Sequence, residues 1–452
     1  MKAQVLASQD LYLHISVGRW ILTNRLIPDH GIFSATMPTA PWVAHEWLAA
    51  VGLASLYDNL GWGGVLATVA LLLAAAIGVL TYETARTIGP IGAICAAVLA
   101  WGLCVNHLVA RPHVAALPLL AVWLATLVHA RRADTVPPIY LALLMTLWAN
   151  LHGSFMFGLV FAALFAAEAM FESDTWEQAR AQAWRWSIFL GASVLAAMVT
   201  PHGLTGLWFP FHMMEIRAAL DTVYEWHASS LSNNAPLILW TFLLLFVALW
   251  HGVRLPICRL AMLMLLLYMA FAHRRHAELL GLAAPLLLQD AVASMLTRSA
   301  PSLMSWGTFV QPAIRRSMIG AALLSVSFAV YAGCRGVTRG PDRYTPSAAL
   351  AAVEANGIKG PVFNGYTFGG YLIFRGYAPF IDGRIDMYGS EFVTRYVSLH
   401  ELAGMLEQYR IAWTIFLPID PSTAVMDSLP GWVRLHADEW SVVHVRKAVP
   451  PR

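Results

Sequence analysis

The stretch Asp10-Leu-Tyr-Leu-His14 places a carboxylate and an imidazole four residues apart. On a helix, residues at this spacing share one face, so both groups can meet the same ligand. A carboxylate there suits general-base work on a sugar hydroxyl, or coordination of a divalent cation that carries a phosphate. The structural alternative is a solvated helix N-cap at Asp10 and an interfacial histidine.

A second pair of titratable residues, His45 and Glu46, stands between Trp42 and Trp47. Tryptophans of this kind form an interfacial belt in membrane proteins whatever their function. Two titratable groups at the start of a predicted helix indicate a binding site, and the alternative is that Glu46 only caps the helix. Asp29 is a further carboxylate, earlier in the same polar stretch.

Short polar motifs also interrupt the apolar sequence farther along the chain. Each combines a histidine with a neighbouring proline or glycine, and the first also contains an arginine. Polar groups at membrane depth usually face a cavity, and a guanidinium binds phosphate bidentately. The alternative is that these residues only end helices and bind no ligand. The residues concerned are Arg111, His113, His152 and His202.

The densest charge cluster of the apolar region contains Arg274, Arg275 and His276. Two adjacent arginines would attract a lipid-linked phosphate or pyrophosphate, although anionic lipid head groups would satisfy them equally well. Glu225 lies in a predicted loop, about 206–234, that is long enough to reach over a site. These residues complete the set of substrate-binding candidates.

The composition identifies the environment in which these residues work. The chain has 452 residues, of which 58% are hydrophobic and 12% charged, and its mean hydropathy is +0.60. Soluble domains carry about 25% charged residues, so this chain could not cover itself with polar surface. No basic cluster interleaved with aromatics suggests nucleic acid. The four cysteines lack metal-ligand spacing. The sequence predicts a multi-pass membrane protein.

The hydropathy pattern predicts a mainly α fold, with a polytopic helical membrane domain and a small α/β domain after it. A spanning helix needs about 20 mainly apolar residues. Residues 1–61 predict a first loop with amphipathic surface helices, 62–335 the membrane domain, and 341–452 the soluble domain. An additional span ahead of the first loop is expected. Candidate spans are roughly 62–83, 91–110, 114–130, 136–150, 154–171, 187–205, 235–251, 255–272, 276–295 and 317–333.

Basic residues favour the cytoplasmic side if residues 1–61 lie outside and the chain then crosses alternately. This arrangement also places the C-terminal domain outside, together with nearly all the unusual polar motifs. One outward-facing polar site is therefore the economical interpretation. We expect a multi-pass membrane protein whose C-terminal domain lies on the outer side.

Within residues 341–452, helix and strand signals alternate. Helices are predicted at 347–355 and 399–409. Strands are predicted at 360–363, 370–374, 379–382, 412–417 and 440–445. Asp382, Arg384 and Asp386 are interpreted first as residues that hold two loops together.

Taken together, these motifs resemble a bacterial family of multi-span glycosyltransferases of the GT-C type. The first part of the resemblance rests on DLYLH at 10–14, GRWI at 18–21, IP at 27–28, FS at 33–34 and PWVAHEWL at 41–48. It continues with ARPH at 110–113, WANLHGSF at 148–155, PHG at 201–203 and YEW at 224–226, and ends with GGYLI at 369–373 and FIDGRIDMYG at 380–389.

The resemblance implies a glycosyltransferase of the bacterial inner membrane, with its C-terminal domain in the periplasm, whose donor is a sugar on a polyprenyl phosphate. Asp10 matches the general base in the first outward loop, and transfer would proceed with inversion. The family often carries acidic residues at the positions of Ser8 and Gly31. Asp29 could replace the second of these in a different register, so a divalent metal ion at Asp10 and Asp29 stays open. Arg111 with Arg274 and Arg275 would hold the phosphate, and His14, His45 and Glu46 would shape the sugar pocket.

Two other functions remain open at this stage. One is a non-catalytic polysaccharide-assembly scaffold or lipid-linked-glycan flippase, for which ionisable groups at the bilayer midplane would be expected. The other is an O-antigen-ligase-like transferase with a histidine base. Expected partners are the lipid bilayer, the polyprenyl-phosphate-linked sugar and other envelope-glycan assembly proteins, but no nucleic acid. The sequence does not identify the sugar or the acceptor.

Overall fold

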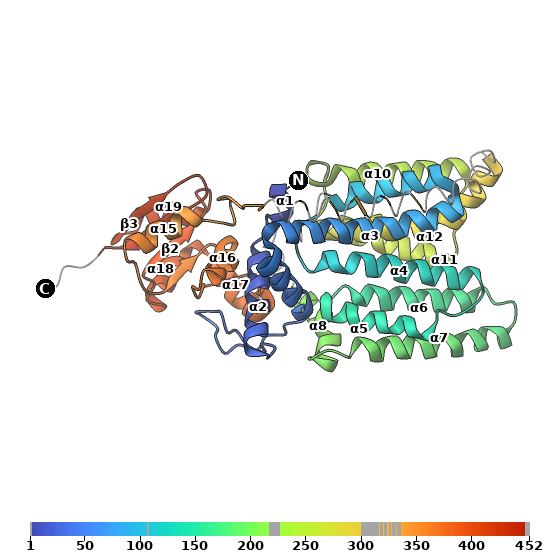
Figure 1. Ribbon diagram of the computed structural model, residues 1–452, viewed down its shortest axis with the longest axis horizontal. Coiled ribbons are helices and arrows are strands. Elements are labelled where there is room, and N and C mark those ends of the chain that lie inside the picture. Colours follow the sequence, from blue (N-terminus) through green and yellow to red (C-terminus); the bar gives the residue numbers. More distant parts are fainter. Residues whose placement is uncertain are drawn as a thin grey trace.

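The computed structural model describes residues 2–105, 108–216, 227–299 and 336–447, with isolated positions between 316 and 331. A long bundle of helices forms one part, and a small α/β domain forms the other (Figure 1). Helix α2 (Gln9–Asn24) lies between them. The first segment of the chain is therefore placed where the two parts meet.

The bundle coincides with the apolar segments that the hydropathy pattern predicts between 62 and 295. Among the described residues, four helices are long and apolar enough to cross a membrane, namely α3, α4, α10 and the segment Arg274–Arg298. The predicted span 317–333 lies largely outside the described residues. The helices are α3 (Trp47–Cys104), α4 (His113–Arg132), α5 (Ala142–Leu151), α6 (Phe155–Phe171), α7 (Trp176–Ala197), α8 (Gly203–Glu215), α10 (Leu231–His251), α11 (Ile257–Ala272) and α12 (Ala277–Ser299).

Helix α3 is bent at two glycines with positive φ, Gly61 (60°) and Gly89 (74°). Glycine tolerates this conformation, and Pro90 after the second bend cannot continue the helical hydrogen bonding. The part of α3 before Gly61 packs closely on α2, because a Cβ on Gly18 would lie 2.1 Å from the carbonyl oxygen of Ala50. The second predicted surface helix is thus the first part of a longer helix.

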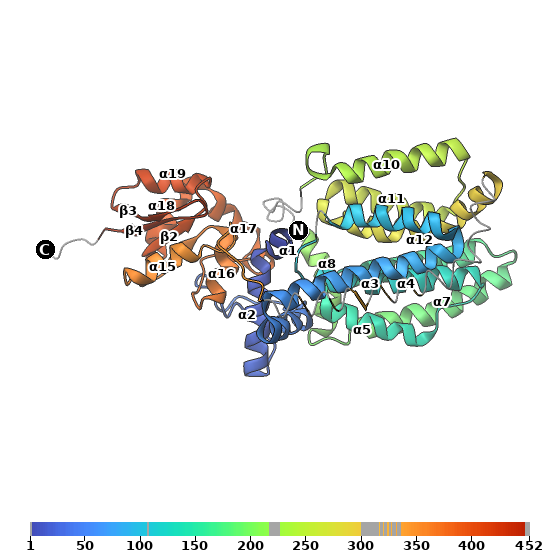
Figure 2. The same cartoon turned by 45° about the horizontal axis from the view of Figure 1, so that its top comes forward.

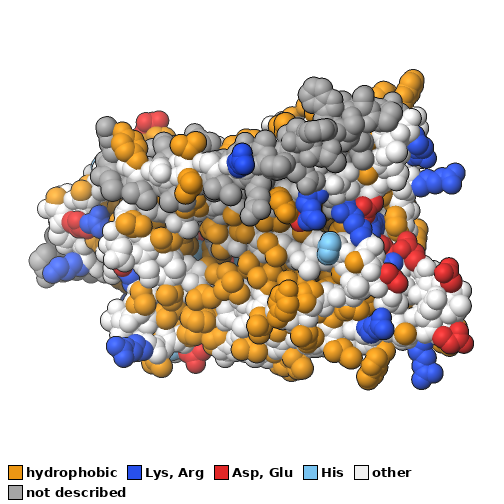
Figure 3. All heavy atoms as spheres, turned by 45° about the vertical axis from the view of Figure 1, so that its right-hand side comes forward, with side chains coloured by type: hydrophobic (Ala, Val, Ile, Leu, Met, Phe, Trp, Pro, Cys, Tyr) orange, Lys and Arg blue, Asp and Glu red, His pale blue; other side chains and the backbone are white. Residues whose placement is uncertain are grey.

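Hydrophobic side chains cover the flank of the bundle, and charged side chains gather towards its ends (Figure 3). At the end away from the α/β domain, Arg259 donates to Glu168 at 3.0 Å and to Asp290 at 2.6 Å. Arg132 also reaches Asp290, and Arg131 binds Glu172. These residues, called here the distal ion network, join α4, α6, α11 and α12.

The α/β domain contains a four-stranded sheet in the order β1-β2-β4-β3, with β1 and β2 parallel and the other pairs antiparallel. Figure 2 shows its helices packed around this sheet. The predicted strands near 360, 412 and 440 are present. The elements are α15 (Ser347–Ala355), β1 (Val362–Asn364), α16 (Gly369–Phe374), α17 (Ile385–Val397), α18 (Leu399–Gln408), β2 (Trp413–Phe416), α19 (Pro421–Ser428), β3 (Trp432–Ala437) and β4 (Val442–Arg446).

Two strand predictions are wrong. Residues 370–374 belong to helix α16, whose glycines allow close backbone contact: a Cβ on Gly370 would lie 2.0 Å from the carbonyl oxygen of Gln9. Residues 379–382 form a loop. There the Asn364 side chain accepts from the amide of Phe380 and donates to the carbonyl of Ile381. A side chain, rather than a neighbouring strand, satisfies that backbone.

The loop before α17 fastens the α/β domain to the first segment of the chain. Asp382 and Arg384 form a buried ion pair with a 2.7 Å contact. The Tyr388 hydroxyl bonds both Asp382 and Ser34, and Thr36 donates to the carbonyl of Phe380 at 2.8 Å. The interpretation that charged residues hold two loops together therefore applies to Asp382 and Arg384. The third, Asp386, takes no part in these bonds.

Candidate active site

Asp10 lies at the start of α2, where three parts of the chain meet. Ser8 caps the helix by accepting from the amide of Asp10, and the Arg111 Nε donates to the Ser8 hydroxyl at 2.7 Å. The Arg111 guanidinium also contacts the Asp10 carboxylate at 3.1 Å. A Cβ on Gly383 would lie 2.2 Å from Asp10 Oδ1. The carboxylate is thus oriented by an arginine from the membrane bundle and covered by the backbone of the α/β domain.

Glu46 lies among three imidazoles. Its carboxylate oxygens are 3.4 Å from His14 Nε2, 3.5 Å from His152 Nε2 and 3.6 Å from His45 Nε2. The histidines come from α2, from the turn after α5 and from the residue before Glu46. We call Glu46 and these three histidines the histidine cluster. Glu46 also begins α3, but its side chain makes no capping bond.

Burial and charge divide the histidines of this cluster into two kinds. Burial lowers the pKa of His14, and it lowers the pKa of His152 to about 4. Burial also acts against the charged form of His45, but the Glu46 carboxylate outweighs it and raises the pKa of His45. Burial would raise the pKa of Glu46, and His45 holds it well below its usual range. The cluster therefore combines an ionised carboxylate with two imidazoles whose neutral form is favoured and with His45, whose charged form is favoured.

Arg274 and Arg275 are adjacent in the sequence but lie in different surroundings. Arg275 acts electrostatically on His113, His152 and His276, so its charge lies beside the histidine cluster. Arg274 is buried and donates to the carbonyl of Asn233 at 3.2 Å. A positive charge is thus supplied to the site by Arg275, together with Arg111.

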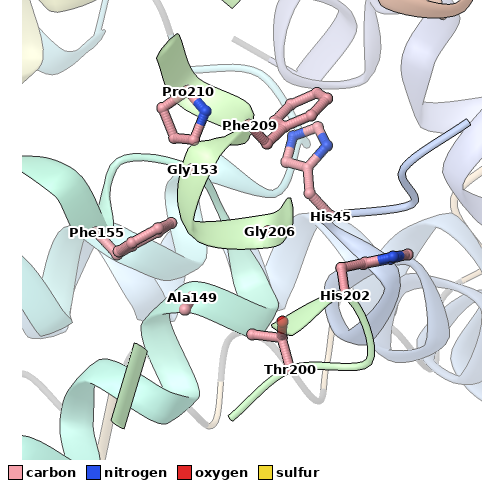
Figure 4. Close-up of a pocket in the computed structure, with 9 residues that line it drawn as sticks. All are labelled: His45, Ala149, Gly153, Phe155, Thr200, His202, Gly206, Phe209 and Pro210. Carbon is pink, nitrogen blue, oxygen red and sulfur yellow. The ribbon is translucent and has the colours of Figure 1, made fainter. Parts of the chain in front are cut away.

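Three further candidates lie around this centre. His113 Nε2 is 3.7 Å from Glu278, and its ring is 6.2 Å from that of His152. His202 shares a small cavity with His45, whose ring stacks on Phe209 with centroids 4.1 Å apart (Figure 4). His276 packs beside His273 at the margin.

Asp29 does not join the centre. The Asp29 side chain is 85% exposed and bonds its neighbour His30 at 2.6 Å. Glu225 lies outside the described residues. A Cβ on Gly31 would lie 2.0 Å from the carbonyl oxygen of Met37, so the acidic residue that resembling proteins carry there would not fit this loop.

The surroundings of Asp10 do not fit a divalent cation. The Arg111 guanidinium pairs with this carboxylate at 3.1 Å, and its positive charge opposes a cation there. Among residues 2–105, 108–216, 227–299 and 336–447, no group of three or more histidine, cysteine or acidic side chains is arranged to hold a metal ion. We therefore derive no catalytic step through a metal.

Asp386 is the residue at this junction that the sequence interpretation missed as a site residue. It lies in the first turn of α17 and acts electrostatically on His45. In the sequence, Asp386 belongs to the charged string IDGRID, which is equally consistent with a purely structural role. Only the packing of the α/β domain on the first segment distinguishes Asp386 from Asp382.

No protein-family model and no curated protein sequence matches the chain. Among solved structures, the oligosaccharyltransferase AglB from Archaeoglobus fulgidus, in complex with an inhibitory peptide and a dolichol-phosphate, is similar with a TM-score of 0.54 and 11% identity. The match covers 91% of this chain and 66% of that one, so the chain spans about two thirds of the length of AglB.

ArnT from Cupriavidus metallidurans in the apo state is similar with a TM-score of 0.52 and 15% identity. That match covers 99% of this chain and 95% of ArnT. Similarity at such low identity shows the fold alone, and it includes both the helical bundle and the α/β domain. The chain has the fold of the GT-C-type membrane glycosyltransferases.

Proposed function

We propose that this protein transfers a sugar from a polyprenyl-phosphate donor to a hydroxyl-bearing acceptor on the outer face of the bacterial inner membrane. The observation that carries the proposal is the Asp10 carboxylate, oriented by Arg111 beneath the α/β domain and next to the histidine cluster. The fold and the dolichol-phosphate held by the similar AglB structure support a lipid-linked donor.

In the proposed reaction, Asp10 accepts the proton of the acceptor hydroxyl as its oxygen attacks the anomeric carbon of the donor sugar. The bond from the anomeric carbon to the phosphate oxygen breaks, and the polyprenyl phosphate leaves with both electrons of that bond. Attack from the side opposite the phosphate inverts the anomeric configuration. Arg111 and Arg275 neutralise the charge that develops on the leaving phosphate.

The position of the charges favours this enzyme over a flippase. Glu168 and Asp290, the acids within the bundle that a transport pathway would use, are both bound by arginines in the distal ion network. The histidine cluster, whose pKa values are shifted by burial and by neighbouring charges, lies at the other end of the bundle, next to α2. We propose that this end faces the periplasm and that the α/β domain lies there as well.

The decisive experiment replaces Asp10 by asparagine, which keeps the size of the side chain and removes the base. Sugar transfer in membranes should fall by roughly 100- to 10,000-fold, the usual contribution of a general base. Asp58→Asn on α3 is the matched control, because Asp58 binds Arg19 at the exposed side of α2.

Full transfer by Asp10→Asn would overturn the proposed mechanism. If His14→Gln abolished transfer and Asp10→Asn did not, the histidine-base mechanism of an O-antigen-ligase-like enzyme would replace it. His14 is suited to that role because it is neutral at pH 7. Equal thermal stability of the variants would show that the loss is chemical.

A further inference from the structure

A second concave surface lies on the α/β domain, apart from the candidate active site. It is a groove of about 480 Å³, formed by the turn after α15, the turn between α18 and β2, and the end of β4. Binding pockets usually have volumes of about 300–1,000 Å³, so the groove is large enough to hold a ligand. It shares no residue with the site around Asp10.

The strand directions place this groove at the end of the α/β domain away from the bundle. The parallel strands β1 and β2 both begin there, and the antiparallel strand β4 ends there. The other end of β1, at Asn364, bonds Phe380, whose carbonyl accepts from Thr36 of the first segment. In Figure 1 the chain also leaves β4 on the side away from the bundle. Lipid head groups around the bundle are therefore not the ligand of this groove.

The rim of the groove carries three cationic side chains and one carboxylate. Arg446 is held in place, since it donates to the carbonyl of Ile411 at 2.8 Å and to Glu407 at 2.8 Å. Lys359 and Arg410 are exposed, and neither forms an ion pair with any residue that the structure describes. Because Glu407 is matched by Arg446, the rim has two positive charges in excess. We call this surface the cationic groove.

Pairing within the domain is the more common arrangement for its arginines. Exposed cations that only face water are also ordinary, so the charge of Lys359 and Arg410 would not indicate a site without the shape of the surface. The paired arginines are Arg375 with Glu354, Arg384 with Asp382, and Arg395 with Glu401.

The floor of the cationic groove is aliphatic and firmly packed. It contains Ile358, Ala412 and Val445, together with Ile411, which is only 1% exposed. The lining residues, all of them described, include no aromatic ring on which a sugar could stack. An apolar floor inside a charged rim is the usual construction of a protein interface, and the positive rim requires an acidic partner.

We propose that the cationic groove docks an acidic segment of a partner protein. An aliphatic side chain of the partner would lie on the floor, and its carboxylates would pair with Lys359 and Arg410. This inference goes beyond the transfer reaction and does not depend on the identity of the donor. It gives the α/β domain a surface for recruiting another protein while its opposite side covers Asp10.

The test begins with random peptides displayed on phage, which are depleted on empty nanodiscs and then selected on the full-length protein in nanodiscs. Selected sequences should contain several acidic residues around one aliphatic residue. A synthetic copy of one selected peptide is then used for affinity measurements. Lys359→Glu and Arg410→Glu should each weaken its binding by roughly 3- to 10-fold, and added salt should weaken it further.

Two further variants separate docking from damage to the domain. Arg343→Glu is the matched control, because Arg343 is exposed on the same part of the chain and lies outside the groove. It should bind the peptide as wild type does. Glu407→Gln should strengthen binding by about twofold, because it removes a like charge from the rim. A gain in affinity cannot result from an unfolded domain.

Three results would overturn the inference. The first is a selection that yields no acidic peptides. The second is equal binding of the selected peptide by wild type, Lys359→Glu and Arg410→Glu. The third is tighter binding of oligogalacturonate, an acidic sugar polymer, than of the peptide, with the same loss in both variants. That result would assign the cationic groove to an anionic glycan instead of a protein.

Discussion

The two ends of the helical bundle carry charge clusters of contrasting construction. The distal ion network pairs arginines with carboxylates at 2.6–3.0 Å, and the guanidinium of Arg259 is shared between Glu168 and Asp290. At the other end, the closest contacts between Glu46 and the imidazoles are 3.4–3.6 Å. One cluster uses groups that are always charged, and the other uses groups whose charge depends on their surroundings.

The difference separates a structural role from a chemical one. Arginine–carboxylate pairs at hydrogen-bond distance fix helices against one another and leave little capacity for a ligand. Imidazoles with perturbed pKa values beside a carboxylate that a ligand can reach are typical of binding and catalytic sites. The distal ion network should therefore respond to mutation in stability, and the histidine cluster in pH dependence and ligand binding.

The largest effect on stability should come from Arg259→Gln. Removal of this guanidinium leaves Glu168, which is only 1% exposed, without its main partner. Breaking a buried pair in this way costs about 3–5 kcal/mol. The midpoint of thermal unfolding in detergent should fall clearly at pH 7, where the unpaired carboxylate is most costly.

Arg180→Gln is the matched control for that measurement. Arg180 is exposed on α7, and its loss should change the midpoint little. An Arg259 variant as stable as this control would show that the distal ion network does not hold the bundle together, and the comparison between the two ends would lose its basis.

The histidine cluster should make stability depend on pH through His152. Its pKa is about 4 in the folded protein against 6.5 when unfolded, so the unfolded chain binds more protons between these values. Stability should therefore rise with pH across this window and fall on acidification. If the whole difference in pKa contributes, it changes the free energy of unfolding by about 3 kcal/mol, at 1.36 kcal/mol per pKa unit.

His152→Gln tests this by removing the titrating group. Unfolding midpoints of wild type and variant, measured in steps from pH 7 to pH 4.5, should converge as the pH falls. His129→Gln is the control, since His129 lies on α4 near the distal ion network. If the unfolding midpoints of wild type and His152→Gln changed in parallel with pH, the conclusion that burial keeps His152 neutral would be wrong.

Much of this arrangement could be predicted from the sequence, because helical hydropathy is a local signal and the polar motifs interrupt it at helix ends. The number of predicted spans alone decides which side of the membrane each loop is expected to face. This count was enough to propose one common side for Asp10, His14, His45, Glu46 and Arg111. The helix α16 could not be predicted. Its short apolar run suits a strand equally well, and its glycines matter only because α2 approaches them.

Roles that depend on tertiary contact were also out of reach of the sequence. Nothing local distinguishes Asp386 from Asp382, since both follow an isoleucine within one charged string. Their difference arises from Arg384, whose side chain bonds Asp382 and not Asp386. Similarly, the sequence does not distinguish Arg274 from Arg275, and only the packing of the bundle buries Arg274.

The smallest effect, and the one that most sharpens the comparison, concerns these two arginines. Arg275→Gln should weaken binding of undecaprenyl phosphate by roughly 10- to 100-fold, as expected for the loss of one charge-assisted bond, with little change in stability. Arg274→Gln should instead lower the unfolding midpoint, because Arg274 is buried and bonds Asn233.

Arg298→Gln, an exposed site near the other end of α12, controls for the loss of one positive charge and should alter neither quantity. If Arg274→Gln lost the lipid and Arg275→Gln kept it, the phosphate would lie deeper in the bundle than the histidine cluster. Asp10 would then be too far from the anomeric carbon to accept the proton of the attacking hydroxyl. This pair of variants therefore tests the position of the donor without requiring knowledge of the sugar or the acceptor.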